Sequence, residues 1–244
     1  MAIGTFFRHV GSKYLTGAHY PPPAHDTIVE PFAGGAGYSV RYHRRRVILV
    51  ERDPEVARVW RYLIGVSARE LLALPDVPLD GSLDDVKCSA DARALIARNL
   101  NFASGPSKRF SAWRDEKRPG KKPGSKLAAL WGPTLRARLA AQVEKIRHWK
   151  VIEGTYSQAP DIEATWFIDA PYQNMLSKIY RHDADVIDFR ALAKFCRERR
   201  GQVIVCENAD ARWLPFRPFG SRMAAYRGKI KPDGVSQEVI WTKP

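Results

Sequence analysis

An acid, a proline and an aromatic residue follow directly after an apolar run in the segment Asp169-Ala170-Pro171-Tyr172. The apolar run predicts a buried strand, and ligands of open α/β sheets bind at the carboxyl ends of strands. The exocyclic amine of a nucleobase is a weak nucleophile. A carboxylate (Asp169) and a carbonyl (Ala170) that accept its N–H groups would free its lone pair and stabilise the developing positive charge. Pro171 holds Ala170 extended, and Tyr172 would stack on an extruded base. We therefore expect catalysis at an amine nitrogen; the alternative is a polar turn beside a buried tyrosine.

A glycine-rich turn lies earlier in the chain, within Pro31-Phe32-Ala33-Gly34-Gly35. Glycines let a ligand approach the backbone, and the helix expected to follow offers free N–H groups at its N-terminus. Glu51 ends the next apolar strand, where nucleotide-binding α/β proteins carry an acid that accepts hydrogen bonds from ribose hydroxyls. The glycine spacing does not match the dinucleotide pattern GxGxxG, so an adenosine-bearing ligand without a pyrophosphate is favoured. The alternative is that the glycines only form a tight turn and that Glu51 only caps the following helix.

The elements that position these residues alternate between strand and helix, which predicts a parallel sheet in an α/β fold. Apolar runs predict strands at 26–32, 47–51, 149–153, 165–168 and 202–206. Helices are expected at 34–44, 54–64, 90–98, 135–147 and 188–199. Gly201 is expected to end the last helix, and segments 222–226 and 237–242 are expected to form an antiparallel pair.

The middle of the chain interrupts this alternation. We interpret residues 67–147 as an insertion, mostly helical or loop, between the two parts (1–66 and 148–244) of a sheet domain. From Arg98 to Lys150 there are 14 Lys or Arg residues against three acids, a surplus of 11 within a formal net charge of +14. Such a surplus favours a polyanionic partner, nucleic acid first; the alternative is a protein that is merely basic and soluble.

Together these motifs resemble those of the Dam-type DNA adenine-N6 methyltransferases, in particular the short phage-borne members. Gly11-Ser12-Lys13-Tyr14 is similar to the Gly-Gly-Lys-Tyr element of that family, and Pro31–Gly35 is similar to its cofactor motif. Glu51 stands where the family has an acid for the ribose, and Asp169-Ala170-Pro171-Tyr172 stands where it has Asp-Pro-Pro-Tyr. The order of cofactor motif, insertion and catalytic motif is also shared.

The resemblance implies a Rossmann-like class I S-adenosylmethionine-dependent methyltransferase sheet with an inserted basic recognition region. The implied reaction is site-specific methyl transfer to N6 of adenine in double-stranded DNA. The residues that it implies for the cofactor S-adenosylmethionine are Lys13, Pro31, Phe32, Ala33, Gly34, Gly35, Glu51 and Asp169. Asp169 and Tyr172 would hold the target adenine. Methyl transfer to RNA or to another amine or amide nitrogen stays open as an alternative, as does a catalytically silent DNA-binding relative.

Three positions depart from the pattern of the family. Ala170 replaces its first proline, so the carbonyl remains but one rigid ring is lost. Thr155 stands where an acid is expected near the adenine of the cofactor, and His9 stands in place of an aromatic residue before the Gly-Gly-Lys element. Rate, base choice and the adenine contact are the properties that we expect these departures to affect.

Within the insertion, we expect Lys108, Arg109, Trp113 and Arg114 to contact DNA. Basic side chains neutralise phosphates, and aromatic side chains stack on bases or fill the gap left by a flipped base. The alternative is a solvated loop whose aromatic residues, among them Phe110, anchor it to the core.

Composition excludes several other classes of protein. No apolar run is long enough for a signal peptide or a membrane span, so we expect a soluble, cytoplasmic protein, and a monomer. The three cysteines (Cys88, Cys196 and Cys206) match no zinc spacing and are interpreted as reduced, buried thiols. His148 and His182 lack partners at metal-binding spacing, and we expect no metal site.

Overall fold

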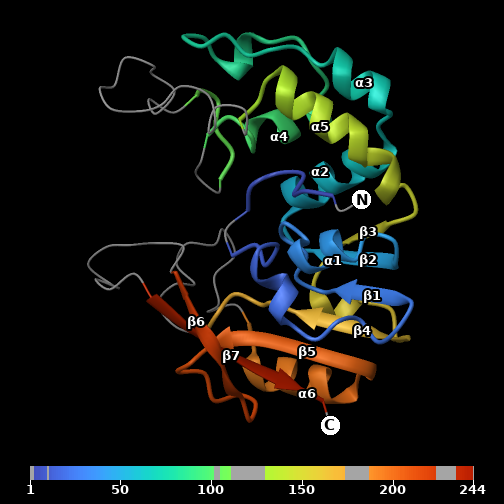
Figure 1. The fold of residues 1–244 in the computed structure, drawn as a ribbon, viewed down its shortest axis with the longest axis vertical. Helices are drawn as coiled ribbons and strands as arrows, with labels where there is room; N and C mark the ends of the chain where they lie inside the picture. The colour runs from blue at the N-terminus through green and yellow to red at the C-terminus, as the bar shows by residue number, and fades with distance from the viewer. Residues whose placement is uncertain are drawn as a thin grey trace.

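The protein folds around one mixed sheet of seven strands in the order β3-β2-β1-β4-β5-β7-β6 (Figure 1). The computed structural model describes residues 3–9, 11–101, 105–110, 130–173, 187–223 and 235–243. The strands are β1 (Thr27–Glu30), β2 (Arg46–Glu51), β3 (Lys150–Glu153), β4 (Glu163–Ile168), β5 (Arg200–Asn208), β6 (Arg217–Met223) and β7 (Val235–Thr242). The first five are parallel, and β7 is antiparallel to both β5 and β6. The predicted α/β class and the antiparallel C-terminal pair are confirmed, and β6 begins earlier than predicted.

Six α-helices lie within the described residues. They are α1 (Gly37–Arg41), α2 (Pro54–Gly65), α3 (Ala68–Ala73), α4 (Ala90–Ala97), α5 (Pro133–Val143) and α6 (Phe189–Glu198). Short 3-10 turns add η1 (Thr16–His19), η2 (Leu83–Asp85), η5 (Glu144–Ile146) and η6 (Tyr156–Gln158). Capping residues fix the N-termini of two helices. Asp53 caps α2, which has Pro54 in its first turn, and Ser67 and Glu70 form a capping box at α3.

Two predicted details of the helices are wrong. The helix expected at 34–44 is only the five residues of α1, because Gly34 (φ 45°) and Ala36 (φ 46°) are left-handed and keep the preceding segment a turn. Gly201 does not end a helix, since α6 stops at Glu198 and Gly201 lies within β5 with φ 91°. A Cβ atom there would lie 2.8 Å from the His25 ring, so the glycine permits a close approach of neighbouring chain segments.

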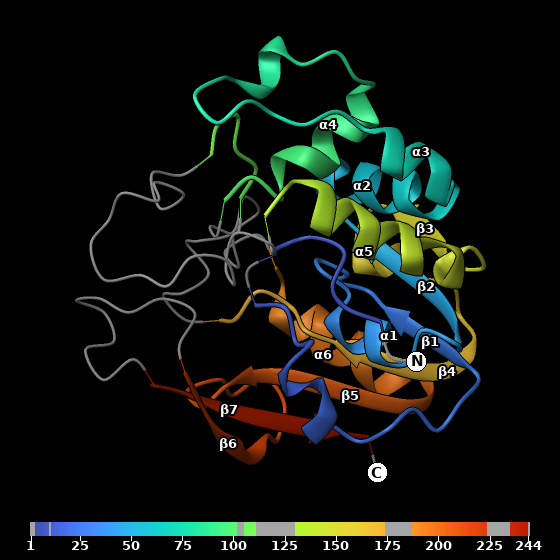
Figure 2. The same ribbon diagram turned by 45° about the horizontal axis from the view of Figure 1, so that its top comes forward.

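The helices cover both faces of the sheet (Figure 2). On one face, Tyr38 of α1 and Trp60 of α2 belong to the same buried cluster as Leu49 of β2. On the other face, α6 packs against alternate residues of β4 and β5, among them Trp166 and Val205. Alternation of side chains along each strand thus supplies two apolar layers, as a doubly wound sheet requires.

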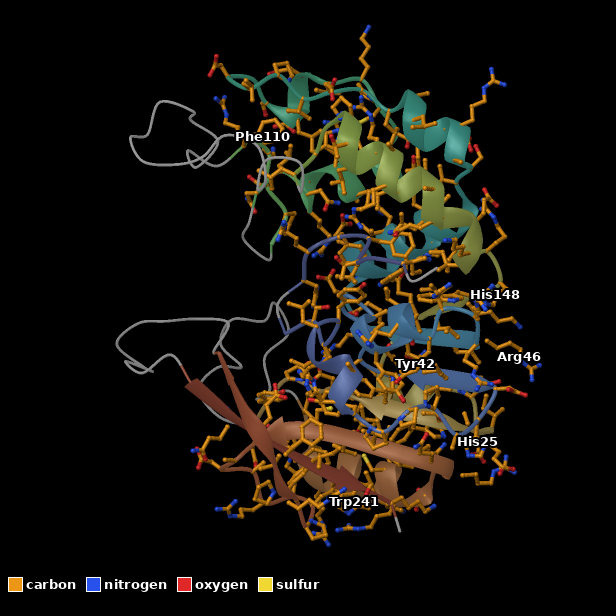
Figure 3. All side chains as sticks on the ribbon, in the orientation of Figure 1. His25, Tyr42, Arg46, Phe110, His148 and Trp241 are labelled. Carbon is orange, nitrogen blue, oxygen red and sulfur yellow. The ribbon has the colours of Figure 1, made fainter. Side chains whose placement is uncertain are left out.

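Helices α3, α4 and α5 form a helical layer beyond α2, at the opposite end of the molecule from β6 and β7 (Figure 1). Its buried residues, among them Leu71, Leu95 and Trp131, belong to the same apolar cluster as the α1 and α2 face of the sheet. Phe110 is partly buried against this cluster and lies at the helical layer (Figure 3). Its contacts therefore match the anchoring alternative rather than base stacking.

The described residues also bear on membrane and thiol chemistry. None of their helices is long and apolar enough to cross a membrane. Cys196 and Cys206 are buried free thiols, while Cys88 is only partly buried, contrary to the expectation for that residue. His148 Nε2 donates one hydrogen bond to the carbonyl of Arg45 (2.9 Å), and His182 lies outside the described residues.

Candidate functional site

The two sequence motifs meet where the order of the strands reverses. β1 and β4 are neighbours at the centre of the sheet, with β2 and β3 beyond β1 and β5 beyond β4. The segment Pro31–Gly35 follows the carboxyl end of β1, and Asp169–Tyr172 follows the carboxyl end of β4. In an open α/β sheet this reversal leaves a crevice outside the strand ends, and ligands bind there.

A pocket of about 290 Å³ occupies this crevice. That volume lies near the lower end of the ~300–1,000 Å³ range of small-molecule sites. All eight residues that the sequence assigned to a cofactor line it: Lys13, Pro31, Phe32, Ala33, Gly34, Gly35, Glu51 and Asp169. The N-terminal segment and the ends of β1, β2, β3 and β4 thus contribute to one cavity.

Glu51 ties the end of β2 to the glycine turn. Its Oε2 accepts the N–H of Gly34 (2.8 Å), and its Oε1 accepts the N–H of Asp53 (2.8 Å). The carbonyl of Gly34 in turn accepts the indole N–H of Trp60 (2.8 Å). Burial raises the pKa of Glu51, against the two backbone hydrogen bonds, which lower it. A carboxylate has about four lone-pair directions, so Glu51 keeps acceptor capacity for a ligand in the pocket.

Lys13 reaches the pocket because Gly37, which has no side chain, lets the backbone of Lys13 pack directly against the start of α1. A Cβ atom at position 37 would lie 2.7 Å from the backbone nitrogen of Lys13 and would also clash with that of Tyr14. From this position the Lys13 ammonium donates to Asp169 Oδ1 (2.6 Å) and to the carbonyl of Gly11 (3.2 Å). A contact between residues 156 positions apart therefore joins the N-terminal element to the segment that follows β4.

The Lys13–Asp169 pair is buried, with exposed side-chain fractions of 6% and 18%. Burial raises the pKa of Asp169, and the ammonium of Lys13 opposes that shift. Burial alone would lower the pKa of Lys13, but the negative charge of Asp169 and further acidic groups, including Glu238, raise it well above its usual value. Lys13 is therefore a fixed cation that holds the carboxylate of Asp169 in place.

The four residues Asp169–Tyr172 do not share one environment. Asp169 and Pro171 line the pocket, whereas Ala170 and Tyr172 are not among the lining residues. Ala170 is 3% exposed and packs in the apolar layer beneath α6. The Lys13 ammonium lies 5.0 Å from the centre of the Tyr172 ring. One face of that ring is thus in contact with Lys13, so a base could stack only on the other face.

Two polar groups that the sequence did not single out for ligand binding lie against the glycine turn. His9 and Ser12 both line the pocket, and a Cβ atom at Gly35 would lie 3.2 Å from His9 Cβ and 3.3 Å from Ser12 Oγ. Among the described residues, neither His9 Nδ1 nor Ser12 Oγ has a hydrogen-bond partner, although both atoms are buried. Burial, reinforced by the charge of Arg98, lowers the pKa of His9 to about 4, so its ring is neutral at pH 7.

Other lining residues also escaped the sequence reasoning. Glu30 ends β1 and accepts the N–H of Ser39 (2.6 Å), and burial raises its pKa to about 8. Tyr156 of η6 stacks on Phe32 with ring centres 5.5 Å apart. Thr155 also lines the pocket, where the resemblance led us to expect an acid. Glu30 ends an apolar run just as Glu51 does, so the sequence pattern could have identified it. The Phe32–Tyr156 contact could not be predicted, because it depends on the tertiary fold.

Of the four expected DNA-contacting residues only Lys108 and Arg109 are described, and neither lines the pocket. Lys108 is 74% exposed at its side chain and pairs with Asp84 (2.7 Å). The backbone of Arg109 is held by Ser107 Oγ, which donates to its carbonyl (2.7 Å). Trp113 and Arg114 lie outside the described residues.

No model of a known protein family matches this chain, and no curated protein has a significantly similar sequence. The family resemblance of the motifs therefore stays a prediction, and the function must be argued from the pocket.

Proposed function

We propose that the chain is an S-adenosylmethionine-dependent methyltransferase that acts on N6 of adenine in duplex DNA. The observation that carries the proposal is the pocket at the strand reversal, which has the Lys13–Asp169 pair on one wall and Glu51 on another. Perturbed carboxyl groups that converge on the main pocket of an α/β sheet are typical of an active site.

The polar groups of the pocket fit an adenosine bearing an amino-acid tail. Glu51 retains lone pairs for ribose hydroxyls, and the turn around Gly34 and Gly35 allows close approach of a ligand. The unpartnered Ser12 Oγ and His9 Nδ1 are suited to the ammonium and carboxylate of the tail, since buried polar atoms without a partner are costly. The absence of a GxGxxG spacing agrees with a ligand that has no pyrophosphate.

S-adenosylmethionine would supply an electrophilic methyl group on a sulfonium. Asp169 and the carbonyl of Ala170 would accept the N–H groups of the target amine and so raise the electron density on its nitrogen. Asp169 would also take up the proton that the amine loses, which its raised pKa favours. Lys13 would keep Asp169 aimed at the pocket, and Pro171 would restrict the conformation of Ala170.

Duplex DNA as the substrate is supported by the overall charge of +14 and by the exposed Lys108 and Arg109. A polyanion is attracted by such a surplus whatever its sequence. RNA carries the same phosphates, so charge does not distinguish the two nucleic acids, and the experiment below compares them directly.

The direct test incubates the purified protein with methyl-labelled S-adenosylmethionine and with random-sequence duplex DNA, single-stranded DNA or RNA, and then identifies the methylated nucleosides. We expect N6-methyladenine in duplex DNA and none with Asp169→Ala. Label in RNA alone would replace DNA by RNA as the substrate. Cofactor binding without label in any nucleic acid would contradict the enzymatic proposal and favour a silent DNA-binding relative.

A further inference from the structure

Glu207 is a buried acid beside the catalytic segment that has no role in the chemistry described above. It is the second-last residue of β5 and is only 1% exposed. β5 pairs in parallel with β4, with Val205 opposite Ile168. The residues that follow Val205 therefore lie next to those that follow Ile168, which are the catalytic segment itself.

The carboxylate of Glu207 accepts three N–H groups from three parts of the chain. Oε2 accepts the backbone N–H of Gln173 (3.3 Å) and the indole N–H of Trp213 (3.1 Å). Oε1 accepts the backbone N–H of Asn208 (2.8 Å). Gln173 directly follows Tyr172, so its bond to Glu207 fixes the far end of the segment whose near end is held by Lys13.

An ionised Glu207 suits this surrounding, and a protonated one does not. All three partners are donors, and a carboxylate is an acceptor only. A protonated carboxyl group would turn a hydrogen toward one of these donors, and the hydrogen bond from that donor would break. The bond to Gln173 is the longest of the three, so it is the one that we expect to break first.

We propose that Glu207 is a positioning residue: as a carboxylate it holds the segment that carries Asp169 and Tyr172 in its active arrangement, and on protonation it releases that segment. This inference rests on the proposed function, because it concerns the control of the same site. It predicts an enzyme that loses activity below neutral pH through a residue outside the reacting atoms.

Burial, more than any neighbouring charge, places this change near neutral pH. Burial raises the pKa of Glu207 to about 7, against the hydrogen bonds from Asn208, Trp213 and Gln173, which lower it; the nearby charge of Asp169 raises it further. Glu238 of β7 is the pairing partner of Asn208, whose side chain points to the other face of the sheet from that of its neighbour Glu207. Glu238 and Glu207 therefore lie on opposite faces of the sheet. On the α6 side, Asp188 is engaged by the N–H groups of Arg190 and Ala191. The carboxylate form thus predominates above about pH 7.

The first experiment compares the wild type with Glu207→Gln. Glutamine keeps the shape and one acceptor oxygen but presents an NH₂ group to the remaining donors, so it imitates the protonated acid. We expect kcat to fall by about tenfold or more, because a displaced catalytic group is costly. The KM for S-adenosylmethionine should change by less than about twofold. The decline of kcat between about pH 8 and pH 6 should disappear in the variant.

Glu163→Gln is the matched control. It removes the same charge from the exposed amino end of β4, away from the carboxyl end that carries Asp169, and should leave kcat and its pH dependence unchanged. An active wild type whose kcat and pH profile are unaltered by Glu207→Gln would overturn the positioning role. An inactive wild type would instead contradict the proposed function, so the two failures are distinguishable.

Trp213 gives a readout that needs no substrate. Because its indole N–H donates to Glu207, its fluorescence should change with an apparent pKa near 7 in the wild type and lose this transition in Glu207→Gln. Trp213→Phe removes one donor that lowers the pKa of Glu207, so the acidic decline of kcat should move to higher pH. An unmoved decline in Trp213→Phe would contradict the proposal even if Glu207→Gln did not fold.

Discussion

The pocket between β1 and β4 and the basic segment 98–150 differ in how their charged residues are used. In the pocket, Lys13, Asp169 and Glu51 form defined contacts and face a cavity that remains open to a ligand. In the basic segment, four of the described arginines are already engaged by the fold. These contacts are Arg98 with Asp53 (3.7 Å), Arg136 with Asp76 (2.6 Å), Arg138 with the carbonyl of Thr5 (2.7 Å) and Arg147 with that of Val66 (2.8 Å).

This difference shows what a charge count leaves out. A surplus of 11 over the basic segment indicates attraction for a polyanion, yet arginines that bind carbonyls and carboxylates of their own chain are structural. Glu51 and Asp169 of the pocket, in contrast, were predicted from their places at strand ends, which parallel strands bring together, and Lys13 was predicted from the family resemblance. The predictions below test whether the two regions really divide chemistry from general attraction.

The largest effect is expected from Asp169→Asn. The variant keeps the size of the side chain but loses the negative charge that accepts from Lys13 and that would accept from the proposed target amine. Removal of one preorganised electrostatic interaction typically costs about 10²–10³ in turnover. Single-turnover methylation of duplex DNA measures the loss. Full activity in Asp169→Asn would show that the pocket is not the reaction site.

Lys13→Met tests the other half of the buried pair. Without the ammonium the pKa of Asp169 should rise further, so a larger fraction of Asp169 is protonated and unable to take up a proton, and kcat at neutral pH should fall. Breaking a buried pair also costs about 3–5 kcal/mol of stability. That loss should be greatest above the raised pKa of Asp169, where the carboxylate is charged and uncompensated, and smaller at acidic pH. Urea denaturation at several pH values measures it, and a loss independent of pH would contradict this account.

Gly37→Ala tests whether close packing of the N-terminal element positions Lys13. The new Cβ would press on the backbone of Lys13 and Tyr14, which should cost about 1–3 kcal/mol and weaken cofactor binding. Gly65→Ala is its control, because a Cβ atom there meets nothing within 4 Å. Thermal denaturation and cofactor titration compare the two variants, and equal effects would refute the steric argument.

Replacements in the basic segment should give the smallest effects and should divide into two kinds. Lys108→Ala and Arg109→Ala should weaken DNA binding about equally on all sequences and reduce the salt slope by about one for each phosphate that the variant no longer neutralises. Arg138→Ala should lower stability, because the bond to Thr5 is removed, and leave the salt slope unchanged. DNA titrations at several salt concentrations measure both, and an unchanged slope for Lys108→Ala and Arg109→Ala would remove these residues from the interface.

Much of the fold and of the pocket could be predicted from the sequence, because the signals were local. Apolar runs ended by glycines or acids marked the ends of β1, β2 and β4, and Pro31–Gly35, Glu51, Asp169 and Pro171 at those ends line one cavity. The same signal marks Glu30 and Glu207, whose importance becomes visible only from the groups that bind them. The short α1 could not be predicted either, because it depends on the left-handed Ala36.

Contacts between distant parts of the chain were beyond sequence reasoning. The stacking of Phe32 on Tyr156, the neutral His9 against the glycine turn and the burial of Arg98 all depend on how the N-terminal segment and the helical layer pack. Each of these requires tertiary packing that no local pattern encodes.

Calorimetric titration of S-adenosylmethionine into the wild type and into Glu51→Gln shows whether the pocket binds this cofactor, independently of any methyl transfer. Glutamine would set an NH₂ group against the N–H of Gly34 or Asp53 and would weaken the acceptor offered to the ligand. We expect one site in the wild type and a loss of about 10-fold to 100-fold in affinity in the variant, the range for a hydrogen bond to a charged group. Failure of the wild type to bind S-adenosylmethionine at about 1 mM, or equal affinity in Glu51→Gln, would contradict the assignment of this pocket.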